Sequence, residues 1–101
     1  MPYGLNQDVI DRINSIFRNY PEIEKVIIYG SRAKGNYKRG SDIDLTISGE
    51  SVASSVINKI SLELDDLFLP YTIDLSNLNQ INNQELLEHI RRVGEPFYIK
   101  E

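Results

Sequence analysis

The sequence contains no cysteine, and this absence excludes several kinds of chemistry. Disulfide bonds, thiolate zinc sites and cysteine nucleophiles all require a thiol. Long apolar runs are also missing, because no stretch approaches the roughly 20 residues that a membrane helix needs. The first residues, MPYGLNQD, show neither the basic start nor the apolar run of a signal peptide. We therefore expect a cytoplasmic protein that does not enter a membrane.

An overall excess of positive charge is absent too. The chain has 11 lysine and arginine residues against 15 aspartate and glutamate residues, a net charge of −4. A protein that coats nucleic acid is usually basic, so we expect no direct nucleic-acid binding. A nucleotide ligand is not excluded, since its phosphates respond to local charge. Two common phosphate motifs, G-x-G-x-x-G and the Walker sequence, are both missing.

The periodicity of the apolar positions predicts three helices. They cover residues 6–20, 51–65 and 82–93. The polar residues Asn6, Ser51 and Asn82 are the expected N-caps, because a short polar side chain can accept from a free N–H of the first turn. The length of 101 residues favours a single domain over residues 1–101.

Short runs of β-branched or alternating apolar residues predict the strands. They cover residues 24–29, 41–48 and 71–75, with a short edge strand at 97–99. The first two strands are too close in sequence for a crossover helix, so we expect them to pair antiparallel. The order of elements predicts an α/β or α+β fold, in which a small mixed sheet of three to four strands packs against helices.

A glycine-serine pair directly follows the first predicted strand. Gly30 lets the backbone turn tightly and lets a ligand approach, because no Cβ blocks it. Ser31 can cap a short helical turn that runs through Lys34, or it can offer its hydroxyl and N–H to a phosphate. For these two residues alone, an ordinary connection between a strand and a turn is the favoured interpretation, because Gly-Ser after a strand is common.

Four cations follow without an intervening acidic residue: Arg32, Lys34, Lys38 and Arg39. Arginine and lysine both bind phosphate well, so this local excess in an acidic chain is a candidate anion site. A solvated charged turn explains it equally well. Tyr37 within the loop could stack on a base, but a surface tyrosine is the simpler interpretation.

Three aspartates lie between apolar residues on predicted strands. Asp42 and Asp44 are two positions apart, so on a strand they point to the same face. Two carboxylates that close repel each other unless a cation lies between them, and Mg²⁺ is the natural partner. Asp74 repeats the pattern on a later strand. If the strands are neighbours, the three acids could hold two metal ions, the arrangement used for in-line phosphoryl displacement. Solvent-facing aspartates on a half-exposed sheet are the alternative.

These residues together resemble a known signature. Gly30-Ser31, ten intervening residues and Asp42-Ile43-Asp44 are similar to the GS-x10-D-x-D pattern of the DNA polymerase beta-like nucleotidyltransferase superfamily. Asp74 matches the position of the third carboxylate of that family. The wording GSRAKGN…GSDIDL and the size resemble its minimal nucleotidyltransferase (MNT) branch.

The resemblance implies a fold and a reaction. It implies the mixed sheet with packed helices of that family, and Mg²⁺-dependent transfer of a nucleoside monophosphate, with AMP from ATP as the expected case, to a hydroxyl. By the same resemblance, Gly30 and Ser31 hold the triphosphate, Asp42 and Asp44 ligate both metal ions, and Asp74 ligates the ion at the acceptor. The charge of Arg32 and Lys34 adds them as candidate ligands of the leaving pyrophosphate.

The resemblance also implies a partner. MNT proteins are commonly paired with a HEPN protein, a helical RNase-like toxin, and act as its antitoxin by attaching AMP to a toxin tyrosine. Residues 75–101 alone follow Asp74, so we expect a site that is open on one side and an acceptor supplied by the partner. Two alternatives remain, a non-catalytic antitoxin that acts by contact and a transferase that modifies a small molecule of the aminoglycoside type. The sequence leaves the oligomeric state open.

His89 is the single histidine of the sequence and lies on the last predicted helix, beside its apolar side. A lone histidine in that position is more often structural or exposed than a ligand. The sequence therefore assigns it no role.

Overall fold

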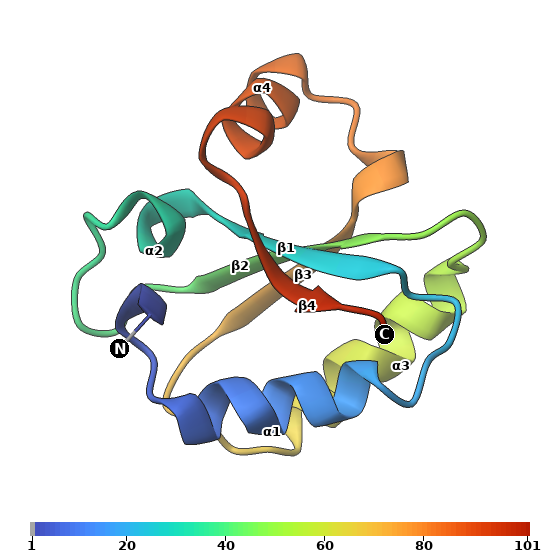
Figure 1. Ribbon diagram of the computed structural model, residues 1–101, viewed down its shortest axis with the longest axis horizontal. Coiled ribbons are helices and arrows are strands. Elements are labelled where there is room, and N and C mark those ends of the chain that lie inside the picture. The colour runs from blue at the N-terminus through green and yellow to red at the C-terminus, as the bar shows by residue number, and fades with distance from the viewer. Residues whose placement is uncertain (1) are drawn as a thin grey trace.

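A four-stranded mixed sheet forms the centre of the computed structural model, which describes residues 2–101 (Figure 1). The strands are β1 (Lys25–Tyr29), β2 (Ile43–Ser48), β3 (Ile73–Asn77) and β4 (Glu95–Ile99). Their spatial order is β3-β2-β1-β4. Strand β1 pairs antiparallel with both β2 and β4, and β2 pairs parallel with β3. The predicted mixed sheet and the predicted antiparallel pairing of the first two strands are thus confirmed.

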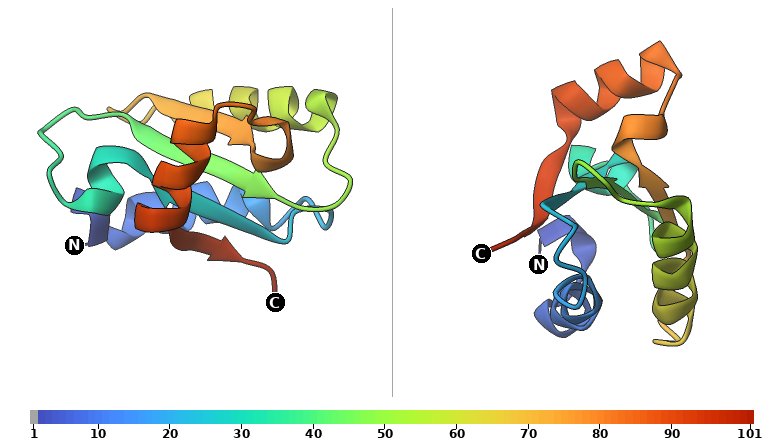
Figure 2. Two further views of the ribbon diagram at one scale, coloured as in Figure 1. Left: turned by 90° about the horizontal axis from the view of Figure 1, so that it is seen from above. Right: turned by 90° about the vertical axis from the view of Figure 1, so that its right-hand side faces the viewer.

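Helices cover both faces of this sheet. They are α1 (Gln7–Phe17), α2 (Gly30–Lys34), α3 (Ser54–Asp65) and α4 (Gln84–Val93), with short 3₁₀ turns η1 (Pro2–Gly4) and η2 (Leu78–Gln80). Figures 1 and 2 show α1 and α3 side by side on one face, and α2 and α4 on the other. No helix within residues 2–101 is long and apolar enough to cross a membrane.

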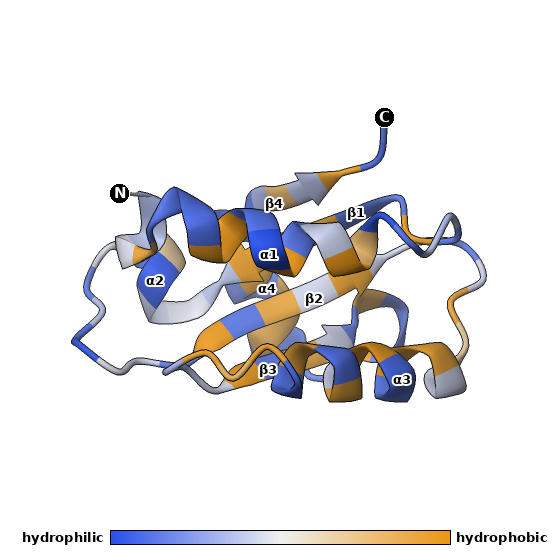
Figure 3. Cartoon of the chain, turned by 90° about the horizontal axis from the view of Figure 1, so that it is seen from below, coloured by the Kyte–Doolittle hydropathy of each residue, from blue (hydrophilic) through white to orange (hydrophobic). Residues whose placement is uncertain are grey.

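The core lies between the sheet and the α1–α3 layer. Every second residue of β2 points into this core, and these residues, Ile43, Leu45 and Ile47, are fully buried. The apolar sides of α1 and α3 face the sheet (Figure 3), with Ile13, Phe17 and Ile60 among the buried residues. Because side chains alternate along a strand, the other face of β2 presents Asp44 and Thr46 toward the α2–α4 layer.

Helix α1 agrees with its prediction apart from its end. The Asn6 side chain accepts a hydrogen bond from the N–H of Val9 at 2.9 Å, so it is the N-cap that the sequence predicts. The helix ends at Phe17, ahead of the predicted Tyr20. After Phe17 the chain forms turns in which the N–H of Asn19 donates to the carbonyl oxygen of Ile16 and the N–H of Tyr20 donates to that of Phe17.

The predicted caps of the two later helices, Ser51 and Asn82, are wrong. Helix α3 begins at Ser54 after Ala53, three residues beyond the predicted cap Ser51. The Asn77 side chain donates to the carbonyl oxygen of Val52 at 3.0 Å, and this long-range bond holds the preceding segment outside the helix.

At the start of α4, Asn83 rather than Asn82 accepts from the N–H of Leu86, at 3.1 Å. The two asparagines are adjacent and chemically equal, so the sequence alone could not choose between them. The predicted end of this helix, before Gly94, is confirmed.

Candidate functional site

The turn between β1 and α2 brings Gly30 against Asp44. Gly30 has φ +76°, in the left-handed region that residues with a Cβ avoid. A Cβ at this position would collide with the carboxylate oxygen Oδ2 of Asp44. Glycine is therefore required here twice, for the backbone conformation and for the close approach of an acidic side chain. The predicted helical turn through Lys34 is present as α2, but it begins at Gly30 with Tyr29 as its N-cap, so Ser31 lies inside the helix and does not cap it.

His89 of α4 contacts the same turn. The backbone N–H of Gly30 donates a hydrogen bond to Nε2 of His89 at 3.0 Å. The imidazole also meets the ring of Tyr29 edge-on, with centroids 6.2 Å apart and planes at 79°. The sequence assigned no role to His89, and a lone histidine on a predicted helix gave no signal for this contact.

Two of the three predicted acids face each other. Asp44 on β2 and Asp74 on β3 occupy directly paired positions of the parallel ladder. Both lie on the face of the sheet that carries α2 and α4, since their neighbours Ile43 and Leu45 are buried on the opposite face. The sequence left open whether the strands of Asp44 and Asp74 are neighbours, and the structure shows that they are.

Asp42 differs from its prediction in one respect. Strand β2 begins at Ile43, so Asp42 is an exposed residue just ahead of the strand rather than a member of it. Its charge still reaches Asp44, because it is one of the causes that raise the pKa of that residue. Asp42 thus lies close enough to act on Asp44, but outside the strand on which the sequence placed it.

Electrostatics at Asp44 favour a cation. Burial raises the pKa of the Asp44 carboxyl, and the charges of Asp74 and Asp42 raise it further. Burial likewise raises the pKa of Tyr29, whose register partner is Asp44. Both shifts have a physical origin in negative charge that is gathered on a partly desolvated surface. A positive ion placed there would relieve this repulsion.

The three acids fit magnesium without forming a closed cage. Within residues 2–101, no group of three carboxylate or imidazole side chains is already gathered as a metal site. Magnesium usually binds through one or two carboxylates together with water and substrate phosphates. The carboxylate chemistry and the raised pKa of Asp44 match that mode.

Arg32 has a structural role that the sequence did not reveal. Its side chain is only 3% exposed. Nε and Nη2 donate to the carbonyl oxygen of Ser41 at 3.1 and 2.9 Å, and Nη1 donates to that of Tyr3 at 2.8 Å. The guanidinium also lies over the rings of Tyr37 and Tyr71, 5.2 and 4.8 Å from their centroids. These contacts occupy the group that we predicted as a phosphate ligand, so the phosphate role of Arg32 is not supported.

The other cations of the loop remain exposed. Lys34 ends α2, the helix that Gly30 and Ser31 begin. Lys38 and Arg39 lie in the following turn, where the N–H of Lys38 donates to the Ser41 hydroxyl at 2.8 Å. Lys34 is therefore the cation of this segment that stays on the helix of the glycine-serine turn and keeps its charge free for a ligand.

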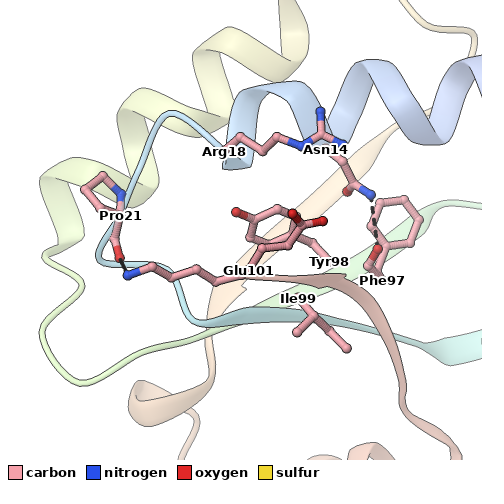
Figure 4. A pocket seen from close by; sticks show the side chains of 8 residues that line it. Asn14, Arg18, Pro21, Phe97, Tyr98, Ile99 and Glu101 are labelled. Atoms are coloured by element: carbon pink, nitrogen blue, oxygen red, sulfur yellow. Dashed lines mark hydrogen bonds between the residues drawn. The ribbon is translucent and has the colours of Figure 1, made fainter.

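A well-formed pocket lies elsewhere on the molecule. It has a volume of about 480 Å³ and lies between α1 and β4, lined by residues such as Asn14, Arg18 and Tyr98 (Figure 4). None of the predicted site residues lines it. The candidate acids lie instead on the sheet face beside α2 and α4, where Asp42 and Asp74 are exposed and Asp44 is half-buried.

Comparison with known proteins gives a family match. The family model described as polymerase beta, nucleotidyltransferase, matches residues 11–101. This range contains every predicted site residue. Comparison with curated proteins gives no match.

Several solved structures share the fold. A toxin–antitoxin crystal structure with AMP-PNP has a TM-score of 0.70 and 19% identity, and the match covers 96% of this chain and 76% of that one. The toxin–antitoxin MntA–HepT has a TM-score of 0.68 and 16% identity, with 94% and 74% covered. A complex of a tri-AMPylated Shewanella oneidensis HEPN toxin with its MNT antitoxin gives 0.69 and 16%, with 95% and 74% covered. At these identities the likeness establishes the fold.

Proposed function

Because the chain belongs to the polymerase beta nucleotidyltransferase family, we propose that it transfers AMP from ATP to a hydroxyl group of a partner protein. The observation that carries this proposal is the pairing of Asp44 with Asp74 on adjacent strands, beside the turn at Gly30. The family establishes a nucleotidyltransferase domain. The nucleotide, the acceptor and the residue roles below are our proposal.

The carboxylates would hold magnesium. Asp42 and Asp44 would ligate two ions, and Asp74 would ligate the one nearer the acceptor. When bound, Mg²⁺ supplies positive charge against the triphosphate and the attacking oxygen. Ser31 binds the triphosphate at the start of α2, and Gly30 leaves space for it because it has no side chain. Lys34, at the other end of this helix, neutralises the departing pyrophosphate.

The reaction breaks a phosphoanhydride bond of ATP and forms a phosphoester bond to the acceptor. The acceptor hydroxyl oxygen attacks the α-phosphorus of ATP, and the bond between that phosphorus and the bridging oxygen of the β-phosphate breaks. AMP is then esterified to the acceptor, and pyrophosphate leaves with the electron pair of the broken bond. Asp74 would receive the hydroxyl proton, a role supported by its exposure and by its position on the same face as Asp44.

We propose a HEPN toxin as the partner and a tyrosine of that toxin as the acceptor, so that the protein acts as an antitoxin. Support comes from the structural relatives, which include a complex with AMP-PNP and a complex whose HEPN toxin is tri-AMPylated. Asp42 and Asp74 are exposed, and this leaves room for an acceptor side chain that belongs to a folded partner protein.

The test is a labelling experiment. The protein is incubated with Mg²⁺, ATP labelled at the α-phosphate and the HEPN-type protein that co-purifies with it, and the label is followed by gel and mass spectrometry. The proposal expects label on a tyrosine of the partner, and none when ATP carries the label on the γ-phosphate. Label on a small molecule, or none on the partner, would contradict it.

A further inference from the structure

Helix α4 lies across the α2 side of the sheet and carries a histidine into the glycine-serine turn (Figures 1 and 2). His89 is partly buried, while its neighbours Glu88 and Arg91 are exposed and pair with each other at 3.0 Å. The histidine therefore points into the molecule from the side of α4 that the charged residues leave free. Polar side chains that face the protein interior are usually hydrogen-bonded.

The partner is the Gly30 backbone. Its N–H donates to Nε2 of His89 at 3.0 Å, which requires a neutral imidazole with its proton on Nδ1. The first N–H groups of a helix have no acceptor within the helix, and Gly30 is the first residue of α2. His89 thus supplies from a distant helix the acceptor that a capping side chain supplies elsewhere, and Tyr29, the residue before the turn, has no such capping bond.

The same glycine touches a catalytic acid. Gly30 is held at φ +76° with its Cα side against Oδ2 of Asp44. A small rotation of this peptide would change the space available to that oxygen. His89, Gly30 and Asp44 therefore form a contiguous series of contacts from α4 to β2.

We propose that His89 is a positioning residue, which fixes the Gly30 peptide through Nε2 and thereby keeps the carboxylate of Asp44 in its place for nucleotidyl transfer. This role rests on the proposed function. The role also gives Gly30 and Ser31 different functions in the turn. The Gly30 N–H is engaged with the protein itself, so the phosphates are bound by Ser31, and Gly30 contributes space alone.

Three variants test this role. His89→Leu keeps an apolar side chain of similar size but removes the acceptor. His89→Gln places an amide oxygen close to the position of Nε2 and restores an acceptor. Arg92→Gln is the matched control, an exposed change on the same helix. Thermal melts first establish that each variant is folded at the assay temperature.

Two measurements follow on the folded variants. The first is NMR of the protein without nucleotide, which reads the tautomer of His89 and the amide signals of Gly30 and Asp44. The second is the rate of AMP transfer to the partner with Mg²⁺ and ATP, resolved into kcat and KM.

The expected result is a selective loss in His89→Leu. The Gly30 amide proton moves upfield and exchanges faster, the Asp44 signal shifts, and kcat falls about tenfold, the scale of one hydrogen bond. The KM for ATP stays within about threefold, because the proposed role has His89 bind the Gly30 backbone and not the nucleotide. His89→Gln recovers most of kcat, and Arg92→Gln matches the wild type.

The role is overturned if His89→Leu leaves kcat and the Gly30 signal unchanged, or if His89→Gln is as slow as His89→Leu. A wild-type protein that transfers no AMP would instead refute the proposed function. In that case the Gly30 and Asp44 signals still decide whether His89 positions the turn.

Discussion

Asp44 and Asp74 occupy directly paired positions on the adjacent parallel strands β2 and β3. Their carboxylates share the face of the sheet that carries α2 and α4, and their mutual repulsion contributes to the raised pKa of Asp44. This arrangement lowers the stability of the metal-free protein and prepares it for cations. The first prediction follows from that conflict.

Replacing Asp44 by asparagine is expected to stabilise the protein in the absence of metal. The pKa of Asp44 is raised in the folded state, mainly by burial, so ionisation of this group costs stability at every pH above its folded pKa. In EDTA at neutral pH, Asp44→Asn should therefore melt roughly 4 °C above the wild type. Added Mg²⁺ should raise the Tm of the wild type and leave that of Asp44→Asn unchanged. The exposed change Asp66→Asn is the control, and an equal Mg²⁺ response in Asp44→Asn and the wild type would refute a metal site at Asp44.

Two glycines offer a matched test of the crowded turn. Gly30 and Gly35 both have left-handed φ values, +76° and +90°, but an added Cβ meets Asp44 at Gly30 and nothing within 4 Å at Gly35. Gly35→Ala should cost about 1–2 kcal/mol of stability from backbone strain alone and keep the transfer rate. Gly30→Ala should cost more and lower transfer roughly 100-fold, because Asp44 must move. Equal transfer rates in the two variants would show that the contact is irrelevant to catalysis.

Substitution of Arg32 should lower stability, whereas substitution of Lys34 should weaken ATP binding. Arg32→Met removes three hydrogen bonds from a buried group and leaves the carbonyl oxygens of Ser41 and Tyr3 without that donor. It should lower the free energy of unfolding by about 2–4 kcal/mol in urea titrations. Lys34→Met, at an exposed site, should stay within about 0.5 kcal/mol but weaken ATP binding. A stable Arg32→Met protein with a specific defect in pyrophosphate release would restore the role that the sequence suggested.

A hydrogen bond between the segment after α1 and helix α3 gives a pH dependence. The Tyr20 hydroxyl donates to Glu63, and this bond, with burial, raises the pKa of Tyr20 from its ordinary value near 10 to about 12. A phenol whose pKa is raised by folding contributes its full stability below pH 10 and loses it as the pH rises through 12. Tyr20→Phe should thus be less stable than the wild type by about 1 kcal/mol at pH 7. Denaturant titrations from pH 8 to 12 should show this difference shrink above pH 10, and a constant difference would contradict the assignment.

Local pattern predicted most of the fold and the acidic half of the site. Strands β2 and β3 alternate apolar residues with others around their aspartates, which places Asp44 and Asp74 on one face once the strands pair. The spacing between β1 and β2 likewise excluded a crossover helix. These are properties of consecutive residues, so a single sequence can reveal them.

The missed features all depend on contacts between distant segments. Ser51 looks like a helix cap, but a bond from Asn77 to Val52 delays the start of α3. Arg32 looks like a phosphate ligand, but the N-terminal turn and the segment before β2 supply carbonyl acceptors for it. His89 is separated from Gly30 by 59 positions. Nothing in the neighbourhood of such a residue signals where its partner lies.

The central claim is that the three aspartates perform AMP transfer, and that this transfer neutralises the partner. The most direct measurement compares the wild type with the variant Asp42→Asn, Asp44→Asn, Asp74→Asn, in one assay that follows both AMP on the partner and the partner's own activity. We predict that the triple variant still folds and binds the partner, that AMP transfer falls by roughly 1,000-fold or more, and that the partner stays active. Full neutralisation of the partner by the triple variant would contradict the account and favour an antitoxin that acts by contact alone.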